Sequence, residues 1–170
     1  VATCKRSMCP FSLTFFLLMT LAGFAQETKL YDVEADASKQ IAAAIKEANA
    51  QNKNVMIQAG GNWCSWCIKF NKFTIADAQI DSIIKASYVL VHLNYSKENK
   101  NEATFASLGF PQRFGFPSFI ILDKTGQRLH TQNSSYLEDG KGSYDRNTVF
   151  EFLQAWTPWA LDPQTYQATK

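Results

Sequence analysis

The spacing of apolar residues divides the chain into alternating helical and extended segments. Apolar side chains recur at helical spacing between Ala35 and Asn52, and Asp36 or Ser38 can cap the start of that helix. Short apolar runs between turn residues are typical of buried strands. We therefore expect helices at 35–52, 63–73, 77–86, 102–108 and 148–156, the last capped by Asn147, and strands at 55–59, 88–94, 118–122 and 127–132.

The order of these segments predicts the fold class. Helices alternate with buried strands, and the turn at 123–126 (Asp-Lys-Thr-Gly) favours antiparallel pairing of the last two strands. This order indicates an α/β fold with a central mixed sheet of about four strands and helices on both faces. Residues 133–145 are polar and contain glycine, so we expect a loop there, and 159–170 show no clear pattern.

The first 25 residues differ from the rest in composition. They carry two basic residues, Lys5 and Arg6, then an uncharged apolar run, and no acidic residue. This layout is typical of a secretory signal peptide, and the run is shorter than the roughly 20 apolar residues of a membrane span. We expect a signal peptide over 1–25, cleaved after Ala25, and one domain over 26–170. An uncleaved anchor is the alternative.

Removing this segment changes the charge and the cysteine count. The whole sequence has 17 Lys and Arg against 15 Asp and Glu, and Lys5 and Arg6 account for its formal net charge of +2. Residues 26–170 are therefore formally neutral and hold no basic cluster, so we expect no nucleic-acid partner. Of the four cysteines only Cys64 and Cys67 remain, and one close pair is not a disulfide scaffold.

This pair lies in 63–67 (Trp-Cys-Ser-Trp-Cys), directly after an expected strand and at the expected start of a helix. A spacing of two residues on a first helical turn lets the sulfurs approach to disulfide distance. The positive end of the helix dipole favours a thiolate at Cys64, and the thiolate is the nucleophile of disulfide exchange. We therefore expect Cys64 to attack a substrate disulfide and the more buried Cys67 to resolve the mixed disulfide.

Two other roles for the pair are open. Half of a zinc site would need two more ligands, and 26–170 offers only His92 and His130, both in expected strands. A purely structural disulfide across so short a loop would add little stability. We expect neither role, and no metal or other cofactor besides the redox-active disulfide Cys64–Cys67.

These residues, together with 115–119 (Gly-Phe-Pro-Ser-Phe), resemble the thioredoxin superfamily, and more narrowly the exported thioredoxin-like proteins of bacteria. The resemblance covers about residues 35–157. It implies a three-layer α/β/α sandwich and protein thiol–disulfide oxidoreductase activity. It also implies that Pro117 is a cis-proline facing the cysteines, with Phe116 offering its backbone to an extended substrate. A trans proline at a strand edge is the alternative.

The sequence departs from the usual thioredoxin pattern at two places. The dipeptide between the cysteines is Ser65-Trp66 instead of Gly-Pro, and because that dipeptide tunes the redox potential, the resemblance leaves the redox direction open. Gln58 stands where thioredoxins often have a buried acid. Glutamine cannot carry a proton at ordinary pH, so another group or water must serve Cys67.

Aromatic residues around the cysteines are the expected substrate contacts. We place Trp63, Trp66, Phe116 and Pro117 in this role, with core packing as an equal alternative for Trp66. Two neighbours, Arg113 and Phe114, could line the same groove or simply lie in a surface loop. Lys69 could add positive potential near the sulfurs, but a solvated helix face is the favoured interpretation.

The favoured hypothesis is an exported, periplasmic or secreted, monomeric enzyme that exchanges dithiols and disulfides with protein substrates. Reduction is slightly favoured over oxidation, and it would need a membrane redox partner because the compartment outside is oxidising. The alternative is a thioredoxin-fold binding or chaperone module for exported proteins, without turnover. Ser65-Trp66, Gln58 and the 133–145 loop favour that alternative.

Overall fold

The computed structural model describes residue 1 and residues 29–167. The expected signal peptide over 1–25 lies, apart from Val1, outside the described residues. Within the described part, no helix combines the length and the apolar character that crossing a bilayer requires.

Four strands form one mixed sheet in the order β2-β1-β3-β4. β1 (Asn54–Gly60) pairs in parallel with β2 (Tyr88–Asn94) and antiparallel with β3 (Ser118–Leu122), which pairs antiparallel with β4 (Arg128–Asn133). Every residue of β1 and β3 is buried, because these two central strands are covered on both faces. The predicted strands are confirmed to within one residue at each end.

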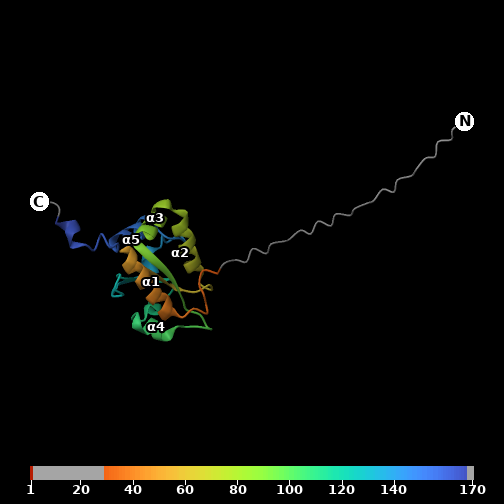
Figure 1. The fold of residues 1–170 in the computed structure, drawn as a ribbon, viewed down its shortest axis with the longest axis horizontal. Coiled ribbons are helices and arrows are strands. Elements are labelled where there is room, and N and C mark those ends of the chain that lie inside the picture. The colour runs from red at the N-terminus through yellow and green to blue at the C-terminus, as the bar shows by residue number, and fades with distance from the viewer. Residues whose placement is uncertain (2–28, 168–170) are drawn as a thin grey trace.

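Helices cover both faces of the sheet and complete a three-layer α/β/α sandwich (Figure 1). α1 (Ala37–Gln51) and α4 (Glu102–Ser107) pack on one face. The other face carries α2 (Ser65–Ala76), α3 (Ala78–Ser87) and α5 (Arg146–Ala155). Figure 1 shows this second group toward the top of the molecule and the first group below it. The predicted fold class is confirmed.

Alternation along β1 decides which side chains reach which face. Val55, Ile57 and Ala59 pack under α1 and α4, while Met56 packs under α2, α3 and α5. By the same alternation Gln58 belongs to the face of α2. The polar side chain of Gln58 is thereby brought beneath the helix that begins at the cysteines.

Aspartates cap the helices at several starts. Asp36 caps α1, accepting hydrogen bonds from the backbone N–H groups of the second and third helical residues. The prediction that Asn147 caps the last helix is wrong. Asp145 is the cap, because its carboxylate reaches the backbone N–H of Thr148 at 2.8 Å, and Asn147 already lies inside α5.

Three short 3₁₀ helices complete the described part of the chain: η1 (Pro111–Phe114), η2 (Ser134–Leu137) and η3 (Pro163–Tyr166). The predicted 133–145 loop therefore begins with a helical turn. Leu137 of that turn is buried in the core beneath α2, α3 and α5, as is Tyr144 at the end of the loop. The loop is thus anchored at both of its ends.

Candidate active site

Cys64 and Cys67 form a disulfide with a Cα–Cα distance of 5.2 Å at the start of α2. Cys64 is the N-cap residue, and its Sγ accepts a hydrogen bond from the backbone N–H of Cys67 at 3.1 Å. Cys64 is 5% exposed, whereas Cys67 is completely buried. Of the two cysteines, Cys64 is therefore the one that reaches the solvent, and its sulfur faces the positive end of the helix dipole.

The turn between β1 and α2 is shaped by two glycines. A Cβ atom on Gly60 would lie 2.4 Å from Cys67 Sγ, and a Cβ atom on Gly61 would lie 2.4 Å from the Trp63 indole nitrogen. Real Cβ atoms do not approach other atoms so closely. Glycine at position 60 lets the end of β1 lie against the disulfide, and glycine at position 61 leaves room for the Trp63 indole.

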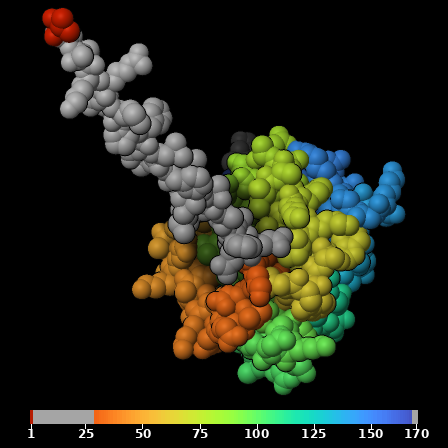
Figure 2. Space-filling model, turned by 90° about the vertical axis from the view of Figure 1, so that its right-hand side faces the viewer, coloured from red at the N-terminus to blue at the C-terminus, as the bar shows by residue number. Residues whose placement is uncertain are grey.

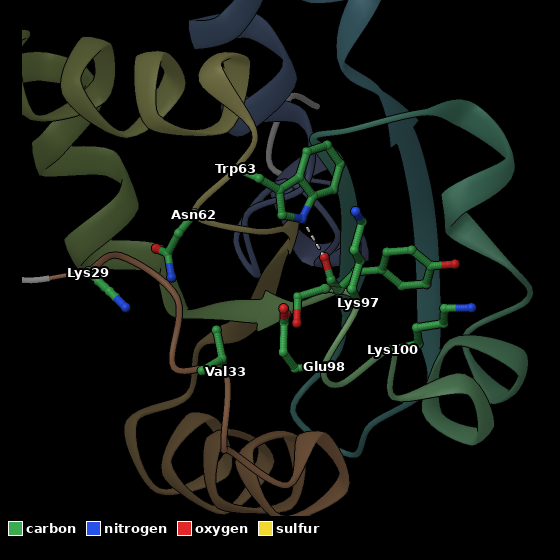
Figure 3. Close-up of a pocket in the computed structure, with 9 residues that line it drawn as sticks. Lys29, Val33, Asn62, Trp63, Lys97, Glu98 and Lys100 are labelled. Atoms are coloured by element: carbon green, nitrogen blue, oxygen red, sulfur yellow. Dashed lines mark hydrogen bonds between the residues drawn. The ribbon is translucent and has the colours of Figure 1, made fainter.

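Two aromatic residues stand beside the disulfide on its solvent side. Trp63 is 60% exposed, and its Nε1 donates a hydrogen bond to the backbone oxygen of Tyr95 at 2.7 Å (Figure 3). Its ring meets Phe116 edge to face, with 5.5 Å between centroids. The Phe116–Pro117 peptide bond is cis, and Pro117 is buried directly before β3. Trp63 and Phe116 thus form one rigid apolar edge.

Trp66 is half-buried in the first turn of α2. Its ring packs edge to face against Tyr144, at 5.3 Å between centroids, and the Tyr144 hydroxyl donates to the Trp66 backbone oxygen at 3.1 Å. The Lys69 ammonium lies 4.4 Å from the Trp66 ring centre and donates to the backbone oxygen of Gly142. Part of Trp66 therefore serves packing, and Lys69 is engaged with the 133–145 loop.

A cluster of buried and half-buried polar residues lies behind Cys67. Gln58 is 1% exposed, and its amide nitrogen donates to Tyr31 Oη at 2.7 Å and to the Cys67 backbone oxygen at 3.0 Å. His92 is paired with Gln58 in the sheet, and its ring meets the Tyr31 ring edge to face at 5.5 Å. The Nε2 atom of His92 is buried without a hydrogen-bond partner among the described residues.

Burial sets the protonation of this cluster. Removal from water raises the pKa of the Tyr31 hydroxyl above its ordinary value and lowers the pKa of His92 to about 4. Near neutral pH both side chains are therefore uncharged, as is the amide of Gln58. Cys67 is thus backed by neutral groups that can form hydrogen bonds.

Tyr31 was not found by sequence analysis, because it precedes the first helix in a segment without periodicity. Two hydrogen bonds hold it: its backbone N–H donates to Asn62 Oδ1 at 3.0 Å, and Asn62 Nδ2 donates to its backbone oxygen at 2.8 Å. Asn62 directly precedes Trp63. Figure 2 shows the segment before α1, in orange, against the yellow start of α2 and the green segment that follows β2.

The two histidines considered as zinc ligands lie apart in the sheet. His92 is on β2 and His130 on β4, the two edge strands. His130 stacks on Trp156, with 4.5 Å between ring centroids. Among the described residues, no group of three or more His, Cys, Asp or Glu side chains is placed to hold a metal ion.

A groove of about 670 Å³ lies beside Trp63 (Figure 3). Its walls come from the segment before α1, from the start of the active-site motif and from the segment after β2: Lys29, Val33, Asn62, Trp63, Tyr95, Ser96, Lys97, Glu98 and Lys100. Arg113 and Phe114 do not line it. The Arg113 guanidinium lies 4.3 Å from the Phe114 ring centre in η1.

Comparison with known proteins identifies the family. A family described as thioredoxin-like matches residues 36–124, which is more than half of the chain. The chain belongs to the thioredoxin-like family. Its disulfide of the Cys-x-x-Cys type lies at the N-terminus of a helix that follows a central strand, an arrangement suited to thiol–disulfide exchange. The resemblance to the thioredoxin superfamily inferred from the sequence is thereby confirmed.

Two relatives and one solved structure give the range of similarity. The chain is 29% identical over 117 residues to the thiol:disulfide interchange protein DsbD of Colwellia psychrerythraea, covering 67% of this chain and 17% of that protein. It is 30% identical over 80 residues to DsbD of Salmonella typhi, covering 47% of this chain and 14% of that protein. The chain thus spans less than a fifth of the length of these relatives.

The disulphide isomerase of Xylella fastidiosa Temecula1 has a similar fold. It superposes with a TM-score of 0.64 at 20% sequence identity, over 74% of this chain and 94% of that structure. At this level of identity the likeness concerns the fold. It supports the order of strands and helices described above.

Proposed function

We propose that this protein is an exported thiol–disulfide oxidoreductase that reduces disulfides in protein substrates through Cys64 and Cys67. The observation that carries the proposal is the placement of the two sulfurs. Cys64 reaches the solvent at a helix N-terminus, and Cys67 is completely buried one turn further on. That arrangement suits one attacking and one resolving cysteine.

In the reduced protein, the Cys64 thiolate attacks one sulfur of a substrate disulfide. The substrate S–S bond breaks, its other sulfur leaves and takes a proton, and a mixed disulfide remains. Cys67 then attacks the Cys64 sulfur, the mixed disulfide breaks, and the Cys67 proton leaves with the second substrate sulfur. The substrate has gained two electrons and two protons, and the Cys64–Cys67 disulfide has closed. No further cofactor takes part in this proposal.

Substrate binding is proposed for Trp63, Trp66, Phe116 and Pro117. The supporting observations are the exposed ring of Trp63, its edge contact with Phe116, and the position of Pro117 at the start of a central strand. An extended substrate could lie along this apolar edge, with its disulfide above Cys64. The exposed part of Trp66 would bound the same edge on its other side.

We further propose a periplasmic or secreted location, a membrane redox partner and a monomeric state. The composition of residues 1–25 supports export. The relatives are named thiol:disulfide interchange proteins, which supports a chain that passes electrons between dithiols. A reductase outside the cytoplasm needs such a source, because its compartment is oxidising.

A trapping experiment tests turnover. Cys67→Ala should accumulate mixed disulfides between Cys64 and substrate proteins, visible as bands on a non-reducing gel that dithiothreitol removes. Cys64→Ala is the matched control and should trap none. If Cys67→Ala binds exported proteins but traps none covalently, the binding-module alternative replaces the enzyme. The 133–145 loop lends that alternative little support, because Tyr144 and Leu137 anchor it in the core.

The redox direction is tested by the reduction potential of the Cys64–Cys67 pair. A value near about −270 mV would match thioredoxin-like reductants, whereas a value near about −120 mV would match strong oxidants. Equilibration with dithiothreitol or glutathione, read by tryptophan fluorescence, measures it. The second value would overturn the reductive direction and leave the exchange activity standing.

A further inference from the structure

The hydroxyl of Tyr31 lies beside the buried sulfur of the active site. A Cβ atom built on Gly60 would lie 2.4 Å from Cys67 Sγ and 2.9 Å from Tyr31 Oη, so both atoms border the same small space. Tyr31 is 1% exposed and belongs to one buried cluster with Cys64 and Cys67. The Tyr31 hydroxyl therefore has as its neighbour the Cys67 sulfur, which changes between disulfide and thiol during the reaction.

The hydrogen bonds around Tyr31 show whether its hydroxyl proton is already donated. The two amide N–H groups of Gln58 donate to Tyr31 Oη and to the Cys67 backbone oxygen, at 2.7 and 3.0 Å. Tyr31 Oη is therefore an acceptor from Gln58, and its own proton is donated to none of the residues that the structure describes. A buried hydroxyl proton without an acceptor costs free energy.

The Tyr31 ring is held in place from several sides. Asn62 binds its backbone at both the N–H and the oxygen, and the His92 ring packs edge to face against the Tyr31 ring with 5.5 Å between centroids. Gln58 holds the hydroxyl itself. A hydroxyl fixed in this way can act on Cys67 without first being ordered, which makes its hydrogen bond more favourable.

We propose that Tyr31 is a positioning residue for Cys67, whose hydroxyl donates a hydrogen bond to the Cys67 sulfur once the disulfide opens, with Gln58 holding the hydroxyl. This role rests on the proposed exchange function and assigns Tyr31 to its resolving step. A thiolate accepts a hydrogen bond more strongly than a disulfide sulfur does. Tyr31 therefore stabilises the reduced pair and lowers the pKa of the Cys67 thiol.

In the resolving step Tyr31 donates its hydrogen bond and keeps its proton. The Cys67 thiol loses its proton, its sulfur bonds to Cys64, and the substrate sulfur leaves with that proton. Tyr31 favours this step by stabilising the Cys67 thiolate as it forms. The neutral cluster of Gln58, His92 and Tyr31 thus supports the step without a buried acid.

Tyr31→Phe tests this role against a matched control. Tyr88→Phe is the control, because Tyr88 is also buried and its hydroxyl donates to the Leu153 backbone oxygen, within the α3–α5 side of the core. Tyr31→Phe should shift the equilibrium with dithiothreitol about threefold to tenfold toward the disulfide, the range for one hydrogen bond. Tyr88→Phe should leave that equilibrium unchanged.

The Cys67 thiol gives a second readout that a merely structural role would not move. Its pKa, measured by ultraviolet absorbance in a Cys64→Ser background, should rise when Tyr31→Phe is added. Gln58→Met, which leaves the hydroxyl in place but unheld, should give a smaller change in the same direction. An unchanged equilibrium and an unchanged Cys67 pKa in Tyr31→Phe would overturn the role of Tyr31.

Both readouts use the purified protein without a substrate, so they are independent of the proposed function. If the unsubstituted protein reduces no protein disulfide but Tyr31→Phe shifts the equilibrium, the proposed function fails and the Tyr31–Cys67 interaction stands. The unsubstituted protein could instead turn over substrate while Tyr31→Phe has the same dithiothreitol equilibrium and the same Cys67 pKa as the unsubstituted protein. In that case the function stands and the interaction fails.

Discussion

The two faces of the sheet are packed with different kinds of side chain. Beneath α1 and α4 the buried residues are aliphatic apart from Phe105. Beneath α2, α3 and α5 the buried residues include five aromatic ones: Phe70, Tyr88, Phe119, Tyr144 and Phe152. The helix that carries the disulfide therefore rests on the aromatic face.

The two faces therefore differ in how they connect to the helix that carries the disulfide. Phe70, one turn after Cys67, packs against Phe119 of β3 at 4.4 Å and against Tyr144 at 5.0 Å between ring centroids. Large rings thus connect the active-site helix to the sheet and to the 133–145 loop. The aliphatic face joins α1 to the sheet, and Phe116 at its edge also packs against the cysteines. Loss of a ring that connects α2 to the sheet should therefore reach the disulfide, whereas a change on the aliphatic face far from Phe116, such as at the end of β3, should not.

Phe70→Ala should have the largest effect. Removing a buried phenylalanine costs about 3–5 kcal/mol of unfolding free energy, because it loses apolar contacts and leaves a cavity. The start of α2 loses its anchor on Phe119, so the reduction potential of the disulfide should change as well. Urea unfolding and equilibration with dithiothreitol measure the two effects. A potential equal to that of the unsubstituted protein would argue against the connection.

Leu122→Ala is the matched change on the aliphatic face. Leu122 is 2% exposed at the end of β3, four residues beyond its start at Ser118. The loss of unfolding free energy should be about 2–5 kcal/mol, as for other buried leucines. The reduction potential should stay as it is in the folded protein. A shift as large as that of Phe70→Ala would show that both faces are coupled to the disulfide.

The same comparison explains which parts of the structure were predictable. The central strands β1 and β3 are mostly apolar runs that are buried on both faces, so their bounds followed from the sequence. The polar edge strand β4 was predictable instead from the turn that precedes it. The cysteine pair and Pro117 carry a local motif. Asp145 and Asn147 are both good capping residues two positions apart, and only the three-dimensional path of the chain decides between them.

The place of Tyr31 in the active site could not be predicted from the sequence. It reaches the active site through hydrogen bonds with Asn62 and Gln58, which lie 31 and 27 residues away. Such partners leave no periodicity and no short motif. Gln58 was recognised as unusual at its position, but its partners could be found only in three dimensions.

Acid should lower the free energy of unfolding by favouring protonation of His92. Burial lowers its pKa to about 4, while in the unfolded chain the pKa is near 6.5. The unfolded state therefore binds the proton more readily, and stability is lost as pH falls from about 6.5 to about 4, by up to about 1.4 kcal/mol for each pH unit. His92→Gln should flatten this slope in urea unfolding between pH 7 and 4.5. An unchanged slope would assign the loss to other groups.

Tyr144→Phe should have the smallest effect and separates the two contributions of the aromatic face. The substitution keeps the ring that packs against Phe70 and Trp66 and removes only the hydroxyl, which donates to the Trp66 backbone oxygen. One hydrogen bond of this kind contributes about 1 kcal/mol to the unfolding free energy. If the rings alone connect α2 to the sheet, the reduction potential should not change. A change comparable to that of Phe70→Ala would show that the hydroxyl, by holding the first turn of α2, is the connection that matters.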